Sequence, residues 1–324
     1  MQAWFCETLS GPEGLVWKEV PTPEPGPGEV RIAIRAASLN FPDILIVQGK
    51  YQFKPALPFV PGSEYSGVVE ALGEGVTNLK VGDAVAAMGS TGGFATHALA
   101  PAKQVLKLPP GFALEDAAAF ALTYGTTHHA LVDRAALKAG ETVLVLGAAG
   151  GVGTSAIELG KVMGARVIAA ASTDEKLALC KKLGADEVIN YSTESLKDKI
   201  KELTGGKGVD VVYDPVGGAL AEAALRSMAW NGRYLVIGFA AGDIPKIPLN
   251  LPLLKGCSIV GVFWGSFVQR EREAQRRNVQ ELWEMFESGR LKPVVGETHA
   301  LADYAAAFES LATRRAQGKV VLLP

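Results

Sequence analysis

The chain has 324 residues, of which 48% are hydrophobic and 20% are charged, and its formal net charge at pH 7 is −2. The length suggests two folded domains, and the composition excludes a disordered or fibrous chain. No basic excess is present, so a nucleic-acid partner is not expected. The three cysteines are widely spaced and the N-terminus lacks a signal-peptide pattern, so we expect a cytoplasmic protein without a membrane span.

The first third of the chain reads as short strands separated by Gly and Pro. After a Pro-rich run at 21–27, strands are expected over 30–36, 65–71 and 84–88. This punctuation is typical of an antiparallel β barrel or sandwich. A merely loop-rich half is the alternative interpretation.

From about residue 121, strands and helices alternate. We expect strands over 142–146, 166–170, 188–190, 209–213, 232–237 and 258–263, and helices over 152–163, 175–183, 195–203 and 220–228. The strands are apolar and β-branched, which predicts an α/β fold with a doubly wound parallel sheet buried on both faces. Six strands match two mononucleotide-binding halves. A charged helix over 271–287 and a strand over 319–323 follow.

A glycine-rich turn joins the first of these strands to its helix. Residues 147–153 read Gly-Ala-Ala-Gly-Gly-Val-Gly. Glycines let a backbone approach a pyrophosphate, and a helix N-terminus offers free N–H groups and a partial positive charge. The turn therefore predicts a dinucleotide site, with a purely structural turn as the alternative. The expected contacts are Gly147, Ala149, Gly150, Gly151 and Val152.

The end of the second strand bears on the choice of dinucleotide. NAD enzymes of this fold place an acidic residue there to hold the ribose hydroxyls, but residues 169–172 read Ala-Ala-Ala-Ser. Ser172 could donate a hydrogen bond to a 2′-phosphate and Lys176 could supply a positive charge, which favours NADPH over NADH. Alternatively, residues 172–175 form a capping box and Lys176 lies on a plain surface.

Five segments together resemble the medium-chain dehydrogenase/reductase superfamily, in its branch of zinc-independent NADPH:quinone oxidoreductases (the zeta-crystallin-like group). They are the glycine-rich turn and residues 37–43, 61–67, 188–191 and 213–218. The resemblance covers nearly the whole chain. It implies a GroES-like, β-rich catalytic domain over 1–121 and 266–324, and a Rossmann NADP(H)-binding domain over 122–265, with the cofactor in the cleft between them.

The resemblance also implies further cofactor contacts. Tyr191 would join Ser172 and Lys176 around the 2′-phosphate. Thr126 matches a position near the nicotinamide, whereas the role of the adjacent His128 and His129 stays open. The other implied contacts follow the ends of later strands, where open α/β sheets bind ligands: Gly217, Gly238, Phe239, Phe263 and Trp264.

Zinc is not expected. The zinc-dependent relatives carry a Cys and a His where this chain has Asn40 and Ser63, the four histidines show no ligand spacing, and no four-cysteine cluster is present. Alcohol oxidation would then lack the group that stabilises an alkoxide. A quinone or an α,β-unsaturated carbonyl, by contrast, accepts hydride when held against the nicotinamide in a dry site.

Three residues are the catalytic candidates. Asn40 could position the nicotinamide ribose or the substrate carbonyl, and Tyr51 could donate a hydrogen bond to the enolate or hydroquinone oxygen. Asp43 is expected mainly to order its loop. The plainer interpretations are a turn asparagine, a packed aromatic ring and an acid at a helix N-terminus, and no chemistry is assigned to Glu64.

The leading functional hypothesis is an NADPH-dependent reductase of quinones or activated enones. One alternative is an enoyl-thioester reductase, because the loop at 40–43 is also similar to enoyl-reductase modules and the charged run Arg270, Arg272, Arg276 and Arg277 could bind a CoA phosphate. Another is an NADPH-binding protein without efficient chemistry. The apolar strand 258–263 would lie at a sheet edge, and the family commonly joins such edges, which predicts a homodimer.

Overall fold

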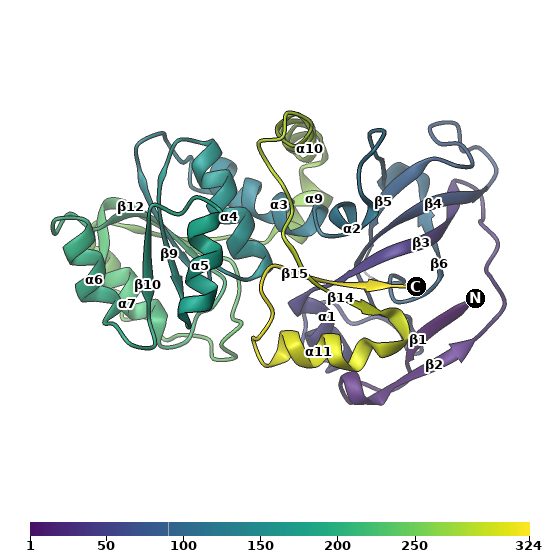
Figure 1. Ribbon diagram of the computed structural model, residues 1–324, viewed down its shortest axis with the longest axis horizontal. Coiled ribbons are helices and arrows are strands. Elements are labelled where there is room, and N and C mark those ends of the chain that lie inside the picture. Colours follow the sequence, from purple (N-terminus) through teal and green to yellow (C-terminus); the bar gives the residue numbers. More distant parts are fainter. Residues whose placement is uncertain (90) are drawn as a thin grey trace. The chain divides into compact units, whose positions relative to one another are not determined.

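The chain folds into two units, each built on its own β-sheet (Figure 1). The computed structural model describes residues 1–89 and 91–324. Residues 1–122 and 293–324 form the first unit, and residues 123–292 form the second unit.

A seven-stranded sheet organises the first unit. Its strands are β3 (Glu29–Leu39), β4 (Glu64–Leu72), β5 (Ala84–Met88), β6 (His97–Pro101), β7 (Val105–Lys107), β14 (Val295–Ala300) and β15 (Lys319–Leu323). They lie in the order β14-β15-β3-β4-β5-β7, with β6 also paired to β3. All pairs are antiparallel except β14 with β15. The expected antiparallel β-rich domain is therefore present, and the C-terminal strand lies inside it.

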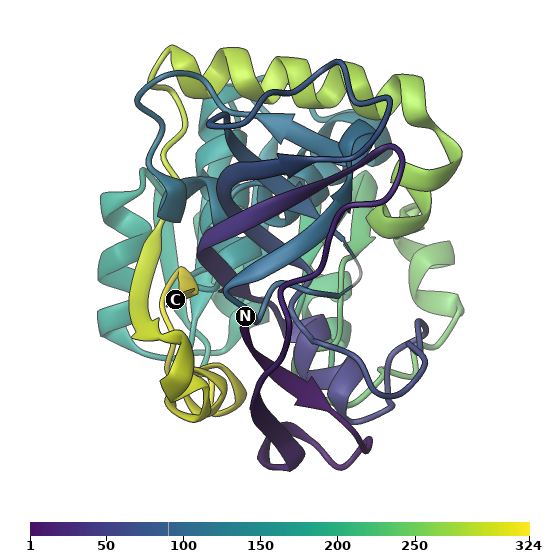
Figure 2. The same cartoon turned by 90° about the vertical axis from the view of Figure 1, so that its right-hand side faces the viewer.

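Short helices and a hairpin complete the first unit. They are the hairpin strands β1 (Gln2–Cys6) and β2 (Leu15–Glu19), the helices α1 (Phe41–Val47), α2 (Leu114–Ala118) and α11 (Tyr304–Ala312), and the 3-10 turns Pro12–Gly14, Ala102–Gln104 and Leu301–Asp303. The ring of Trp4 in β1 lies 3.9 Å from that of Tyr304, so the hairpin and α11 pack together (Figure 2). Both chain termini lie in this unit.

The second unit holds a six-stranded sheet in which every pair is parallel. Its strands are β8 (Thr142–Leu146), β9 (Arg166–Ala171), β10 (Glu187–Asn190), β11 (Val209–Asp214), β12 (Met228–Val236) and β13 (Ser258–Gly261). The order β10-β9-β8-β11-β12-β13 places β8 and β11 at the centre, where two mononucleotide-binding halves meet. The prediction of a doubly wound parallel sheet is thus confirmed, with β13 at one edge.

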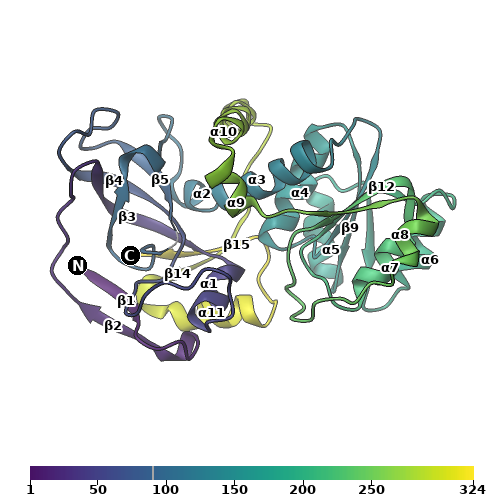
Figure 3. The same ribbon diagram turned by 180° about the vertical axis from the view of Figure 1, so that it is seen from behind.

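Helices cover both faces of this sheet (Figures 1 and 3). The helices of the second unit are α3 (Ala121–His128), α4 (Gly151–Val162), α5 (Asp174–Lys182), α6 (Leu196–Leu203), α7 (Leu220–Arg226), α8 (Asn250–Lys255), α9 (Trp264–Arg270) and α10 (Arg272–Glu287), with a π-helical turn at His129–Arg134. Leu144 and Ile168 of the sheet form one apolar cluster with Ile200 of α6 and Leu225 of α7. Strands buried in this way carry the apolar runs seen in the sequence.

The boundary between the units falls after Lys292, whereas the sequence analysis assigned residues 266–292 to the catalytic domain. Contacts in the second unit explain the difference. The His129 ring stacks on Phe267 of α9 at 3.9 Å, and Asn278 Nδ2 of α10 donates to Asp133 Oδ2 at 2.8 Å. His128 Nε2 is also 3.0 Å from Glu281 Oε2 of α10. The two histidines, whose role the sequence analysis left open, thus contact α9 and α10 within the second unit.

Within the described residues, we find no helix that combines the length and the apolar character needed to cross a membrane.

Candidate functional site

The glycine-rich turn starts at the carboxyl end of β8. Gly147 has a positive φ of 57°, and a Cβ at Gly153 would lie 2.5 Å from the Gly147 carbonyl oxygen and 2.6 Å from that of Ala148. Any larger residue at 153 would therefore collide with backbone. The helix α4 consequently begins directly against the end of β8.

The first turn of α4 has the properties of an anion site. Its N-cap is Gly150, and no side chain caps it. The first N–H groups of the helix, at Gly151, Val152 and Gly153, have no partner within the helix, and the dipole adds partial positive charge. A Cβ built at Gly150 would have only the Gly147 carbonyl oxygen within 4 Å, at 3.4 Å. This helix start therefore fits a dinucleotide pyrophosphate, whereas the neighbouring Ala149 is buried.

Ser172 and Tyr191 lie at one edge of the sheet. β9 ends at Ala171, which pairs with Asn190, the last residue of β10. Tyr191 N donates to the Ala171 carbonyl oxygen at 3.1 Å, and Ser192 Oγ donates to the Ser172 carbonyl oxygen at 2.9 Å. The register of two parallel strands thus brings the predicted phosphate contacts 172 and 191 together.

Lys176 lies in the first turn of α5, but the capping differs from the alternative considered from the sequence. Thr173, not Ser172, is the N-cap, and its hydroxyl accepts the Lys176 N–H at 3.3 Å. The neighbouring carboxylate of Asp174 is also hydrogen-bonded, because Asn190 Nδ2 donates to Asp174 Oδ1 at 2.7 Å. Ser172 is consequently not used as a helix cap.

The turn after β11 is held by a carboxylate that the sequence analysis did not single out. Asp214 Oδ1 accepts the N–H groups of Val216 at 2.7 Å and Gly217 at 2.9 Å, and its other oxygen accepts the Tyr234 hydroxyl. Gly238 N lies 3.3 Å from the Asp214 carbonyl oxygen. A Cβ at Gly217 would lie 2.9 Å from Phe239 Cδ1. Gly217, Gly238 and Phe239 are therefore neighbours in the structure.

The last two residues that the resemblance implies as cofactor contacts, Phe263 and Trp264, differ in their exposure to solvent. Phe263, the N-cap of α9, is 55% exposed, whereas Trp264 is buried. A Cβ at Gly125 of α3 would lie 2.4 Å from Trp264 Cζ2, so the indole packs against α3. Thr126 is half-buried on the same helix. The Trp264 indole therefore serves to pack α9 against α3.

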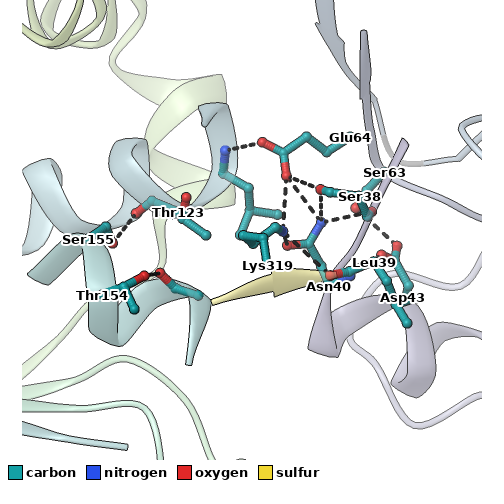
Figure 4. A network of polar contacts seen from close by, with 12 residues as sticks. Ser38, Leu39, Asn40, Asp43, Ser63, Glu64, Thr123, Thr154, Ser155 and Lys319 are labelled. Atoms are coloured by element: carbon teal, nitrogen blue, oxygen red, sulfur yellow. Dashed lines mark hydrogen bonds and ion pairs between the residues drawn. The ribbon is translucent and has the colours of Figure 1, made fainter. Parts of the chain in front are cut away.

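A buried polar network surrounds the start of α1 in the first unit (Figure 4). Asn40 is the N-cap of this helix and Asp43 lies in its first turn. Asp43 Oδ2 accepts the Asn40 N–H at 2.8 Å, as in a capping box, and Asp43 Oδ1 accepts the Ser63 hydroxyl at 3.0 Å. Asp43 therefore links the start of α1 to Ser63.

The carboxamide of Asn40 has partners on both sides. Lys319 Nζ donates to Asn40 Oδ1. On the other side, Asn40 Nδ2 lies 3.4 Å from both the carbonyl oxygen and the hydroxyl of Ser38, and 3.3 Å from Glu64 Oε2. Glu64 in turn accepts the Ser38 hydroxyl at 2.6 Å and the Leu122 N–H at 2.8 Å.

The sequence analysis missed Lys319. It lies 279 positions from Asn40, and the pairing of β15 with β3 brings the two residues together. Its Nζ also lies 3.3 Å from Glu64 Oε2, and both side chains are buried. The available signal was a lysine at the start of a strand that is otherwise entirely apolar, Lys-Val-Val-Leu-Leu.

Burial shifts the protonation of two candidates. It raises the pKa of Asp43 to about 6, although hydrogen bonds from Asn40 and Ser63 and the charge of Lys319 act in the opposite direction. Burial, assisted by the Asp43 carboxylate, also raises the pKa of Tyr51. The Tyr51 phenol thus keeps its proton at neutral pH and is a hydrogen-bond donor.

No group of three or more His, Cys, Asp and Glu side chains suited to a metal ion occurs in residues 1–89 and 91–324. At the two positions where zinc-dependent relatives carry ligands, Asn40 and Ser63 are hydrogen-bonded to Lys319 and Asp43 instead.

The fold and this site define a dehydrogenase/reductase built from a GroES-like domain and a nucleotide-binding domain. Residues 26–110 match the family "Alcohol dehydrogenase GroES-like domain" and residues 151–287 match "Zinc-binding dehydrogenase". A quinone oxidoreductase of Pseudomonas aeruginosa is 40% identical over 97% of each chain. A quinone oxidoreductase-like protein 2 homolog of Nematostella vectensis is 40% identical over 99% of this chain and 88% of its own length.

A comparison with solved structures supports the same family. The Escherichia coli quinone oxidoreductase complexed with NADPH is 32% identical, with full coverage of both chains and a TM-score of 0.91. This chain belongs to the quinone oxidoreductase family of the medium-chain dehydrogenases/reductases, which confirms the resemblance and the fold class predicted from the sequence.

Proposed function

We propose that this protein is an NADPH-dependent reductase that transfers hydride to quinones or to α,β-unsaturated carbonyls without a metal ion. One observation carries the proposal. The uncapped start of α4 adjoins the end of β9, where residues 169–172 carry no carboxylate, and Ser172, Tyr191 and Lys176 follow the ends of β9 and β10 and begin α5. The two sites adjoin because Ala148 N donates to the carbonyl oxygen of Ala170 in β9 at 3.1 Å.

The second unit would bind the cofactor. The N–H groups at the start of α4 suit the pyrophosphate, and the cluster of residues 172, 176 and 191 suits a 2′-phosphate. The neighbouring residues 217, 238 and 239, with Thr126 and the chain at 263–264, would contact the nicotinamide half. Related quinone oxidoreductases from Escherichia coli and Thermus thermophilus form complexes with NADPH, which supports the assignment. When bound, NADPH supplies the hydride.

The first unit would provide the polar groups for the acceptor. The protonated Tyr51 phenol can donate a hydrogen bond to the oxygen on which negative charge develops. Asn40 would position a reactant, and Asp43 would hold the loop that carries Asn40. A quinone or an α,β-unsaturated carbonyl is already electrophilic, so positioning and hydrogen bonding suffice for hydride transfer without a Lewis acid.

The test is NADPH oxidation, followed at 340 nm, with a panel of quinones and enones before and after treatment with a chelator. We expect oxidation with at least one acceptor, equal rates after chelation and tight NADPH binding by calorimetry. Absence of NADPH binding would overturn the proposal. Binding without turnover of any acceptor would favour the non-catalytic alternative, and loss of turnover on chelation with rescue by Zn²⁺ would refute metal independence.

Four exposed arginines favour a second candidate, an enoyl-thioester reductase. Among the described residues, no ion pair or hydrogen bond involves the side chains of Arg270, Arg272, Arg276 and Arg277. Free guanidinium groups could bind the phosphates of a CoA thioester. Turnover of crotonyl-CoA far above that of quinones, and lost in Arg276→Ala/Arg277→Ala, would decide for this candidate.

We also propose a cytoplasmic homodimer formed through the edge strand β13. Several large apolar side chains are exposed in β12, in β13 and in the chain segment that joins them: Trp230, Ile244, Leu249, Leu253, Leu254 and Ile259. Unpaired strand edges and contiguous apolar surface both favour association. The three cysteines are free thiols, and a reducing compartment keeps thiols in this form.

A further inference from the structure

The carboxamide of Asn40 lies between two groups of opposite hydrogen-bonding character. The Lys319 ammonium contacts Oδ1, and the Glu64 carboxylate contacts Nδ2 at 3.3 Å. An ammonium group only donates hydrogen bonds, and an ionised carboxylate only accepts them. Turning the amide by 180° would place its NH2 against the ammonium and its oxygen against the carboxylate. The ion pair therefore permits only one orientation of this side chain.

This orientation decides what Asn40 can offer a ligand. The two Nδ2 hydrogens face Glu64 and the backbone and hydroxyl oxygens of Ser38, so each has an acceptor within the protein. Oδ1 has two lone pairs, and within the described part of the chain only Lys319 donates to it. The free hydrogen-bonding capacity of Asn40 is thus one acceptor lone pair.

The position of Lys319 is itself fixed. Its backbone begins β15, whose next residue, Val320, pairs with Leu39 beside Asn40. The preceding Gly318 has a φ of 69°, and a Cβ there would lie 2.4 Å from the Val294 carbonyl oxygen. The third contact of Nζ is the Leu39 carbonyl oxygen at 3.5 Å. Lys319 is 5% exposed, so its ammonium stays on these three oxygens.

We propose that Lys319, paired with Glu64, is a positioning residue that holds Asn40 as a hydrogen-bond acceptor. Asn40 Oδ1 would then accept a hydrogen bond from a hydroxyl group, such as a ribose hydroxyl of NADPH. Asn40 would not donate a hydrogen bond to the carbonyl of the acceptor substrate. This inference rests on the proposed function and chooses between the two roles that the sequence left open for Asn40. It assigns a role to the last strand of the chain, to which the sequence analysis gave none.

The test compares Lys319→Met, Lys319→Arg and the double variant Lys319→Met/Glu64→Gln. Lys319→Met leaves a buried carboxylate uncompensated and can fail to fold, whereas the double variant removes both charges together. Lys107→Met is the matched control, because Lys107 pairs with the buried Asp83 of the same unit at 2.8 Å but does not contact Asn40. Thermal unfolding identifies which variants fold.

We expect the double variant to bind NADPH about fivefold more weakly, as for one lost hydrogen bond, with an unchanged KM for the quinone. Lys319→Arg retains a donor and should regain most of the affinity, and Lys107→Met should match the wild type. Wild-type NADPH affinity in a folded double variant would overturn the proposal. A rise in quinone KM with unchanged NADPH affinity would show that Asn40 serves the carbonyl instead.

A measurement on the cofactor-free protein separates this inference from the proposed function. In the wild type labelled with 15N-asparagine, the side-chain amide of Asn40 should give one pair of resonances with slow hydrogen exchange, and Lys319→Arg should preserve both. Rapid exchange or two populations in the wild type would refute the positioning role. If the wild type neither binds nor oxidises NADPH, the proposed function fails, while the amide signal still reports on Lys319.

Discussion

Asp43 carries an ionisable group in an environment that disfavours its charge. Its pKa in the folded protein is about 6, against 3.8 for the ordinary side chain, because burial outweighs its hydrogen bonds and the charge of Lys319. As the pH rises from about 4 to about 6, the unfolded chain releases this proton while the folded protein keeps it. The contribution of Asp43 to the free energy of unfolding is therefore greatest at low pH and declines across this window.

Replacing Asp43 by Asn should remove that decline. Relative to Asp43→Asn, the wild type should lose up to about 3 kcal/mol of unfolding free energy between pH 4 and pH 6, and little above pH 6. Denaturant unfolding of both proteins at several pH values measures this difference. Asp83→Asn is the control of opposite sign, because the hydrogen bond from Lys107 lowers the pKa of Asp83 and its stabilisation is lost as the pH falls. A flat difference for Asp43→Asn would contradict the buried, protonated carboxyl.

A substitution of Lys176 tests whether the protein discriminates NADPH from NADH. It lies in the first turn of α5, close to the strand end at Ser172. Lys176→Ala should weaken NADPH binding about tenfold, the effect of roughly 1.4 kcal/mol, and leave NADH binding unchanged. Lys182→Ala, at the opposite end of the same helix, should change neither affinity. Equal losses for NADPH and NADH in titration calorimetry would show that Lys176 does not contact a 2′-phosphate.

At the scale of elements, the close approach of α4 to β8 depends on Gly153. Alanine there would gain about 0.5–1 kcal/mol of helix propensity. Its Cβ, however, would lie 2.5 Å and 2.6 Å from two carbonyl oxygens of the turn, and such overpacking costs about 1–3 kcal/mol. Gly153→Ala should therefore lower the unfolding temperature and the NADPH affinity together.

Gly265→Ala is the matched control for this prediction. Gly265 also lies in the first turn of a helix, α9, but a Cβ there would meet only Phe263 Cε2, at 3.8 Å. The control should retain wild-type stability. If Gly153→Ala melted at the wild-type temperature, the turn would have room to move and the contact would not limit the position of α4.

The sequence located the elements of the second unit closely because propensity and burial agree there. β8 matches the predicted 142–146, and α4 is displaced by one residue from the predicted 152–163. The sequence did not predict α3, α8 and α9, and β12 begins four residues before its predicted start at 232. The chain leaves α7 after Arg226 and enters β12 at Met228, because Met228 already pairs with Val209 of β11. Such a pairing between distant segments has no local signature.

At the scale of the whole molecule, a substitution in the edge strand β13 tests the proposed homodimer. Ile259 in this strand is 43% exposed, and Trp230 beside the edge is 72% exposed. Ile259→Lys would place a charge on each of two paired edges and should convert a dimer into a monomer, as read from light scattering at micromolar concentration. The folded unit should keep its melting temperature.

Val81→Lys is the control for the assembly, since Val81 is also an exposed apolar residue, at 59%, but belongs to the first unit. It should leave the dimer intact. A wild-type protein that is monomeric at these concentrations would refute the proposed homodimer. A dimer that survives Ile259→Lys would place the interface elsewhere.

The sequence by itself determined the alternation of strands and helices from β8 to β12, the parallel sheet, the glycine-rich turn and the absence of an acid at the end of β9. Each of these depends on residues close together in the chain, whose propensities and spacing act locally. Tertiary structure alone decided that Lys319 and Glu64 enclose the Asn40 amide, that Asp214 holds the turn at 216–217, and that α9 and α10 join the second unit. Those contacts join residues up to 279 positions apart, and the free energy of burying a charged or polar group there depends on partners that no local pattern identifies.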